Sequence, residues 1–211
     1  MTIIIIVITV AISFFALKDA SVMSSLIFNP YKTITNKQWY RLVTHGFIHA
    51  DFTHLLVNMI VLFSFGQAVE NIFGMLQTQG IISSSKVMFI ALYFGGIVIA
   101  SLPSLRKQRG NYYYNSLGAS GAVSAVVFTS IFFQPLSNIY LFFAIPIPSI
   151  LFGVAYLAYE HYMAKKGQGN INHDAHFAGA IFGFIFPILL EPKLIFHFLQ
   201  SIGLGWLRNI L

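Results

Sequence analysis

Six long stretches of apolar residues, separated by shorter polar segments, form the main pattern along this chain. The hydrocarbon core of a bilayer is about 30 Å thick and requires a helix of about 20 apolar residues, with about 17 as a practical minimum. A segment in lipid must satisfy its backbone hydrogen bonds internally, so each stretch is predicted to be a transmembrane helix. Several stretches are near the minimum length, and some are expected to stop short of one membrane face. The predicted spans are residues 3–17, 54–73, 87–102, 117–133, 139–159 and 175–190.

Prolines mark predicted ends and bends of these helices. Proline has no backbone N–H to donate, and it breaks or kinks a helix interior. Pro103, Pro135 and Pro192 are therefore predicted to end the third, fourth and sixth spans. Pro146 and Pro148 lie inside the fifth predicted span, where they either hinge the helix as a substrate gate or form a kink that neighbouring helices cover.

The link between the first two spans, residues 18–53, is long. It carries Trp39, Tyr40, Phe47 and Phe52. Such aromatic side chains prefer the headgroup zone of a bilayer, so this first loop is predicted to lie against the membrane. Residues 193–211, with Trp206 and Arg208, are predicted to form an interfacial tail. No internal repeat is visible, and the chain is predicted to form one domain over residues 1–211.

Composition supports a membrane protein and excludes several other classes. Apolar residues make up 57% of the chain and charged residues 9%, with a mean hydropathy of +0.76. An ordinary soluble domain is about 25% charged, and disordered segments are polar, so neither class fits. The net charge of +6 suits anionic lipid headgroups, whereas the scattered basic residues argue against nucleic acid as a partner. The absence of cysteine excludes disulfides, thiolate metal sites and a cysteine nucleophile.

The basic residues also bear on orientation. If six spans alternate, the first, third and fifth loops share one side and contain nine Lys and Arg, against three on the other side. The positive-inside rule would place the side with nine in the cytoplasm.

Polar residues occur at the starts of the second, fourth and sixth predicted spans. A polar group in hydrocarbon costs several kcal/mol unless it is paired, so these residues are candidates for function. His54 and Asn58 are four residues apart and share one helical face. Ser120 lies at the start of the fourth span, and His176 at the start of the sixth. In a bundle of alternating direction these three starts lie on one membrane side, so the four side chains are predicted to meet in one pocket.

This set of side chains is suited to acyl transfer. Ser120 is the candidate nucleophile and His176 the candidate general base. The backbone N–H of Ser120, at a helix start, and the side chains of His54 and Asn58 are candidate donors of an oxyanion hole. Asp174 lies two residues before His176 and faces another side of the helix. No acid is therefore expected to orient the histidine, and a Ser–His dyad is predicted.

Glycines accompany both candidate catalytic residues. Gly118 and Gly121 flank Ser120, where they permit a tight turn and the close approach of a substrate. Gly179 and Gly183 form a small-xxx-small seam, which would let the sixth helix approach the fourth closely.

Plainer interpretations stay open. Ser120 could serve helix packing alone, and His54 and Asn58 could form a polar clasp between helices. Histidine is also the commonest metal ligand, although the sequence has no His-Glu-x-x-His and no carboxylate in register. The histidines that could contribute to a metal site are His45, His49, His54 and His173.

In this order and on these spans, the motifs resemble the rhomboid intramembrane serine proteases, in their minimal six-span bacterial form. The resemblance covers residues 38–183. The motifs are Trp39-Tyr40-Arg41 with Thr44, then His49, His54-x-x-x-Asn58, Gly66-x-x-x-Glu70, Gly118-x-Ser120-Gly121 and Ala175-His176-x-x-Gly179-x-x-x-Gly183.

The resemblance implies the same roles for Ser120 and His176, and it makes His54 and Asn58 oxyanion-hole side chains. Arg41 and Glu70 resemble polar anchors of the first loop and second helix, and together they could form an internal ion pair. The family often has an aromatic residue four positions after the serine, stacked on the base, where this chain has Ser124.

The family also places the first, third and fifth loops outside the cytoplasm. We follow that pattern over the charge count, and expect a multi-pass protein of a bacterial inner membrane whose site opens to the non-cytoplasmic side.

The sequence therefore predicts an all-α membrane protein, a six-helix bundle of rhomboid type with a long membrane-associated first loop. Its predicted activity is that of a serine endopeptidase that cleaves transmembrane segments. No cofactor or metal is required. The expected substrates are single-span membrane proteins with helix-destabilised segments, which would enter between the second and fifth helices. The alternatives are a catalytically inactive member of the same fold that binds transmembrane clients, and a small polytopic transporter.

Overall fold

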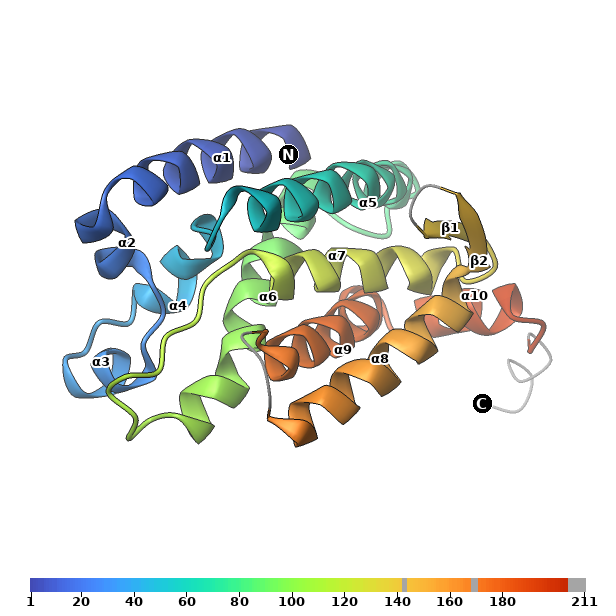
Figure 1. Cartoon of the computed structure of the whole chain (residues 1–211). Coiled ribbons are helices and arrows are strands. Elements are labelled where there is room, and N and C mark those ends of the chain that lie inside the picture. The colour runs from blue at the N-terminus through green and yellow to red at the C-terminus, as the bar shows by residue number, and fades with distance from the viewer. Residues whose placement is uncertain (142–143, 168–170, 205–211) are drawn as a thin grey trace.

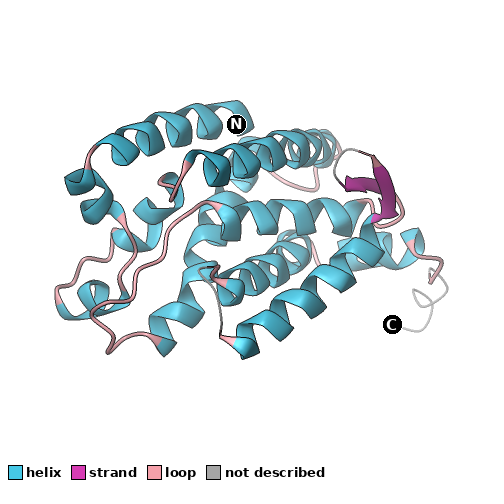
Figure 2. Cartoon of the chain, viewed as in Figure 1, coloured by secondary structure: helices cyan, strands magenta, loops and turns pink. Residues whose placement is uncertain are grey.

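The structure, a computed structural model, describes residues 1–141, 144–167 and 171–204. Most of them are helical, and a single small hairpin lies at one end of this described part (Figure 2). The six long helices are α1 (Thr2–Lys18), α5 (Phe52–Thr78), α6 (Ser85–Lys107), α7 (Ser120–Phe133), α8 (Ser149–Lys166) and α9 (His173–Leu190). The shorter elements are α2 (Ala20–Leu26), α3 (Pro30–Thr35), α4 (Arg41–Thr44), the 3₁₀ helix η1 (His45–Phe47), α10 (Leu194–Ser201), and strands β1 (Asn138–Leu141) and β2 (Ile145–Pro148).

The predicted helical membrane bundle is confirmed, with one long helix overlapping each predicted span. In the described residues, α5, α6 and α9 are long and apolar enough to cross a membrane, and α1 and α7 are shorter apolar helices. At 1.5 Å per residue, the 27 residues of α5 extend about 40 Å, whereas the 14 residues of α7 extend only about 21 Å. Because the hydrocarbon core is about 30 Å thick, at least one end of α7 lies inside it.

Helix α7 runs through the centre of the bundle (Figure 1). Helix α5 lies along one side of it and α9 along the other, while α1 covers α5 and α8 lies beside α9 at the outer edge. Every residue of α7 from Gly121 to Phe133 is buried. A helix that is apolar and buried all round is typical of the core of a membrane bundle. Ser120, the first residue of α7, therefore begins a helix that is packed against α5, α6, α8 and α9.

Glycines bring α7 and α9 into backbone contact. A Cβ atom added at Gly179 would lie 2.1 Å from the carbonyl oxygen of Gly121, and one added at Gly183 would lie 2.0 Å from that of Ala125. Thr129 strengthens the seam, because its hydroxyl donates to the carbonyl of Gly183 over 2.7 Å. Small residues of this kind let transmembrane helices pack closely in the absence of a hydrophobic driving force.

The fifth predicted span is wrong in its first half. Pro146 and Pro148 lie in β2, which pairs antiparallel with β1 in the register Ile139↔Ile147, and the helix α8 begins only at Ser149. A proline has a fixed φ and no N–H, which suits an edge strand better than a helix interior. The two prolines therefore precede the helix, and the predicted hinge or kink within it is absent.

Other helix boundaries also differ from prediction, and three of them have a clear local cause. Helix α6 continues through Pro103 to Lys107, because a proline near a helix end removes one hydrogen bond that neighbouring groups can replace. Helix α7 begins at Ser120, three residues later than predicted, since Gly118 has a φ of +116° that no helix allows. Helix α9 begins at His173, where the side chain of Asn172 caps it by accepting the N–H of Ala175.

Four short helical segments fold the first loop against the bundle, and Arg41 organises them. Its guanidinium donates to the side chain of Gln38 over 2.6 Å and to the carbonyls of Ser24 and Ile27 over 2.9 and 2.6 Å. The two large aromatic side chains beside it, Trp39 and Tyr40, are about half exposed, at 52% and 49%.

The expected ion pair between Arg41 and Glu70 is wrong. Glu70 accepts the backbone N–H of Thr2 over 3.0 Å and pairs with the terminal amine of Met1. The loop meets α5 at its first residue, Phe52, and Glu70 lies 18 residues further, which is about 27 Å along the helix. In the predicted tail, the described residues form α10, while Trp206 and Arg208 lie outside the described residues.

Candidate active site

Ser120 is the first residue of α7 and directly follows a tight turn. Gly118, in its positive-φ conformation, donates its N–H to the carbonyl of His45 over 3.0 Å, and Ala119 donates to Nε2 of His49 over 3.3 Å. The first four N–H groups of a helix have no acceptor within it, so the N–H of Ser120 is available to a ligand. The local sequence thus places a hydroxyl and a backbone donor at one point.

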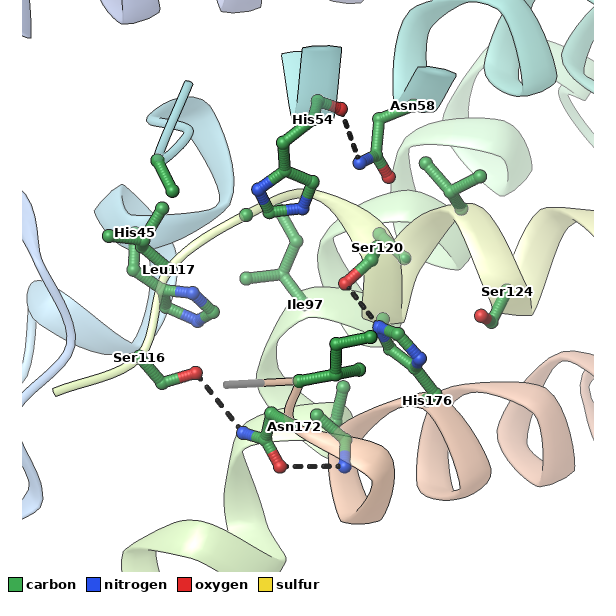
Figure 3. A pocket seen from close by; sticks show the side chains of 18 of the residues that line it. His45, His54, Asn58, Ile97, Ser116, Leu117, Ser120, Ser124, Asn172 and His176 are labelled. Carbon is green, nitrogen blue, oxygen red and sulfur yellow. Dashed lines mark hydrogen bonds between the residues drawn. The ribbon is translucent and has the colours of Figure 1, made fainter. Parts of the chain in front are cut away.

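The side chain of His176 meets Ser120 across the seam between α7 and α9. The distance from His176 Nε2 to Ser120 Oγ is 2.7 Å, a hydrogen bond (Figure 3). Asn172 fixes the start of α9 beside α6 and the loop that leads to Ser120, because its amide donates to the hydroxyls of Ser104 and Ser116 over 3.0 and 3.1 Å. The two residues predicted to share a proton are therefore in direct contact.

An acid lies beside His176, and the expectation that none does is wrong. Glu160 of α8 places Oε1 3.1 Å from Nδ1 of His176 and Oε2 2.6 Å from Nδ1 of His173. Asp174, the acid weighed from sequence, instead pairs with Lys107 at 2.7 Å. The sequence did not indicate this residue because the fifth predicted span ended at residue 159, one residue before Glu160, whereas α8 continues to Lys166.

A cavity of about 1080 Å³ contains the Ser120 and His176 side chains, and His54 and Asn58 line it as well. In Figure 3 these two lie across Ser120 from His176. The ring of His54 lies against Gly118, where an added Cβ would come within 2.7 Å of its Cε1 atom. The amide of Asn58 donates to the carbonyl of His54 over 2.8 Å. All four predicted site side chains therefore face one cavity.

His45 and His49 stabilise the turn before Ser120. Nε2 of His45 lies 2.8 Å from the hydroxyl of Ser101, and Nδ1 of His49 lies 3.0 Å from that of Ser13. Burial lowers the pKa of His45 to about 4 and that of His49 to about 3, and the neighbouring His54 adds to the second shift. A neutral His49 is required here, since its Nε2 atom accepts the N–H of Ala119.

The four histidines considered as metal ligands do not converge. His49 and His54 are in edge-to-face contact at 4.9 Å between ring centres, but His45 is bonded to Ser101 and His173 to Glu160. Within the described ranges, the one group with spacing suitable for an ion is Glu160 with His173 and His176. Those three side chains are already joined by direct hydrogen bonds.

Ser124, at the position where the family often has an aromatic residue, is paired with a tyrosine from another helix. Its hydroxyl lies 2.8 Å from that of Tyr156 on α8. The ring of Tyr156 stacks on Phe152 and lies against Phe128, with ring centres 5.9 and 5.6 Å apart. An aromatic side chain is thus present at this wall of the cavity, but α8 supplies it instead of α7.

Residues 36–193, more than half of the chain, match the family described as the Rhomboid domain. The protein belongs to the rhomboid family and is an integral membrane protein.

Individual relatives agree with this assignment. The chain is 32% identical over 151 residues to "RHOMBOID-like protein 12, mitochondrial" of Arabidopsis thaliana, and the matched region covers 67% of this chain and 43% of that protein. It is 28% identical over 171 residues to "Putative rhomboid protease YdcA" of Bacillus subtilis (strain 168), covering 76% and 71%. It is 31% identical over 144 residues to the human "Presenilin-associated rhomboid-like protein, mitochondrial", covering 65% and 34%.

The chain covers different shares of these relatives. The chain spans less than half of the Arabidopsis and human proteins but most of the Bacillus one. Two of the three are named as mitochondrial, so the expectation of a bacterial inner membrane is not supported.

Proposed function

We propose that this protein is an intramembrane serine endopeptidase. The observation that carries the proposal is the 2.7 Å contact between Ser120 Oγ and His176 Nε2 inside a cavity of about 1080 Å³. A serine hydroxyl is a weak nucleophile at its free pKa and needs an adjacent base. In the proposed reaction His176 accepts the proton of Ser120 as Oγ attacks the scissile carbonyl, and returns it to the leaving amine.

The negative charge that forms on the carbonyl oxygen needs preorganised donors. The N–H of Ser120 and the side chains of His54 and Asn58 are the proposed donors, because they border the cavity on the side away from His176. Asn58 would exchange its bond to the His54 carbonyl for the oxyanion. Removing one such donor costs about 10²- to 10³-fold in kcat in a serine protease.

The proposed substrate is a transmembrane segment of another protein, which enters sideways between α5 and α8. A helix hides its carbonyls in its own hydrogen bonds, so attack requires an extended backbone. Segments that contain helix-breaking glycine or proline near the scissile bond are therefore the preferred substrates. A small residue just before that bond, and a site that opens to the non-cytoplasmic side, follow from the family resemblance.

The test is labelling of the detergent-purified protein with a fluorophosphonate probe, together with cleavage of a reporter transmembrane segment. Wild type is expected to be labelled and active. Ser120→Ala is expected to lose both, and His176→Ala to lose at least about 10³-fold in rate. Ser130→Ala, which removes a buried hydroxyl three turns further along α7, is the matched control and is expected to keep both.

Two results would contradict the proposal. Labelling that survives Ser120→Ala would show that another residue reacts. A folded wild type that is neither labelled nor active, yet retains a transmembrane peptide, would favour the inactive client-binding alternative.

A further inference from the structure

Glu160 is an anomaly of helix α8. The residues of this helix that are buried are Ser149, Gly153 and Glu160, and Glu160 is only 4% exposed. A buried charge costs several kcal/mol unless it is paired and hydrogen-bonded. Glu160 satisfies this condition through α9, because each of its two oxygens contacts one imidazole.

The two contacts fix the state of both rings. A carboxylate only accepts hydrogen bonds, so Nδ1 of His176 must carry a proton to bond with Oε1 of Glu160. In the neutral ring, Nε2 is then without a proton and can accept the hydroxyl proton of Ser120 at 2.7 Å. The position of one carboxylate therefore selects the tautomer that a general base requires.

The second oxygen of Glu160 points away from His176 toward another histidine. His173 contacts this second oxygen at 2.6 Å, and the ring of Tyr159 lies edge-on against His173 with ring centres 5.8 Å apart. The other titratable groups that face this cluster are Tyr156 on α8, His54 across the cavity on α5, and the Lys107–Asp174 pair on α6 and α9.

We propose that Glu160 is a positioning residue for His176, and that α8 thereby supplies the third member of a Ser–His–Glu triad. This inference rests on the proposed function. Ser120 Oγ bonds to the carbonyl carbon while its proton moves to His176 Nε2. Nδ1 keeps its proton, Glu160 stays ionised and stabilises the imidazolium, and the proton on Nε2 passes to the leaving nitrogen as the peptide bond breaks. Water then hydrolyses the acyl-enzyme by the same proton route.

A purely structural role for Glu160 is the competing explanation, because the carboxylate also joins α8 to α9. His173→Gln separates the two roles. It disrupts the bond between Glu160 and residue 173 but leaves the bond between Glu160 and His176 in place. Glu160→Gln keeps the size of the side chain and removes its charge, and Glu160→Asp keeps the charge on a shorter side chain.

The experiment measures kcat, KM and the pH–rate profile of the full chain in detergent, with thermal unfolding of each variant. Glu160→Gln is expected to lower kcat about 10²- to 10⁴-fold with KM within about threefold. A carboxylate stabilises a protonated imidazole, so the acidic limb of its profile is expected to move to lower pH. His173→Gln is expected to keep kcat within about threefold and the pH–rate profile unchanged. Glu160→Gln and His173→Gln are expected to lose similar thermal stability. Glu160→Asp, which also guards against a folding failure of Glu160→Gln, is expected to recover part of kcat and the wild-type profile.

Equal losses of kcat in Glu160→Gln and His173→Gln, with one shared pH profile, would show a structural clasp and overturn the inference. If Ser120→Ala abolishes activity while Glu160→Gln retains it, only this inference fails. If wild type is folded and inactive, the proposed function fails, and this inference fails with it.

Discussion

The contact between α7 and α9 differs in kind from the contact between α8 and α9. Glycines form the first, so that backbone atoms of Gly121 and Ala125 lie where the side chains of Gly179 and Gly183 would be. The second depends on the carboxylate of one side chain, and most of α8 is exposed or half-buried. The distance between nucleophile and base is therefore set by backbone packing, whereas the orientation of the base is set by a single side chain that can be substituted.

The most severe way to break the first contact is Gly183→Ala. The new Cβ would lie 2.0 Å from a backbone oxygen that cannot rotate away, so the helices must separate. We expect a loss of at least about 3 kcal/mol in the free energy of unfolding, together with loss of fluorophosphonate labelling. Unfolding in detergent by increasing SDS would measure it.

Gly74→Ala on α5 is the matched control, since nothing lies within 4 Å of its added Cβ. It is expected to raise stability by about 0.5 to 1 kcal/mol, as alanine does for glycine in a helix. Equal stability of the two variants would mean that the seam separates at little cost, and would remove the basis of the comparison.

The α5 side of the cavity extends the comparison to a third helix. Asn58→Ala removes a proposed oxyanion donor and is expected to lower kcat by about 10²- to 10³-fold with little change in KM. Steady-state cleavage of a transmembrane reporter would measure both constants. Ser64→Ala, at an exposed position of α5 whose hydroxyl bonds only to its own helix, serves as the control. A rise in KM with unchanged kcat would assign Asn58 to substrate binding instead.

The loop behind Ser120 is expected to respond to acid. The histidine pKa is about 6.5 in an unfolded chain, but burial lowers it to about 3 for His49 and about 4 for His45. Below pH 6.5 the unfolded chain therefore binds more protons than the folded one. The contribution of neutral His45 and His49 to the free energy of unfolding is complete above about pH 6.5. It decreases by about 1.4 kcal/mol per pH unit for each ring as the pH falls toward the pKa of that ring in the folded protein.

Thermal unfolding between pH 7.5 and pH 4.5 would measure this slope. His49→Asn keeps a polar side chain at the turn and is expected to have a shallower slope than wild type, at some cost in stability at neutral pH. An unchanged slope in this variant would show that His49 does not carry the acid sensitivity.

The smallest expected effect comes from the polar contacts of α8 that do not reach His176. Tyr156→Phe removes the hydrogen bond to Ser124 while keeping the ring between Phe128 and Phe152. We expect a loss of about 0.5 to 1.5 kcal/mol in stability and a change in kcat within about threefold. A double-mutant cycle with Ser124→Ala would measure the coupling. A large loss of kcat would mean that the packing position of α8, and not Glu160 alone, determines the orientation of His176.

Local sequence signals predicted the helices and part of the site. The apolar stretches were sufficient for the bundle, because lipid permits little except helices. The spacing of His54 and Asn58, and the polar starts of α7 and α9, were sufficient to bring four side chains to one cavity. Each of these inferences uses only neighbours along the chain or the alternation of spans.

The features that sequence reasoning missed depend on contacts between distant segments. Glu160 is 16 residues from His176, and no periodicity shows which face of α8 meets α9. The hairpin escaped notice because its Ile-Pro-Ile-Pro strand is as apolar as a span. Arg41 and Glu70 were matched by charge alone, although the helix between them is too long for a contact.

The glycine seam also affects how the site responds to the bilayer. A membrane that is thinner or thicker than the hydrophobic length of a bundle makes helices tilt. Because α7 and α9 touch through their backbones, such a tilt moves them as one unit and leaves the Ser120–His176 separation unchanged. Helix α8 has no comparable seam, so a change in bilayer thickness alters its position first.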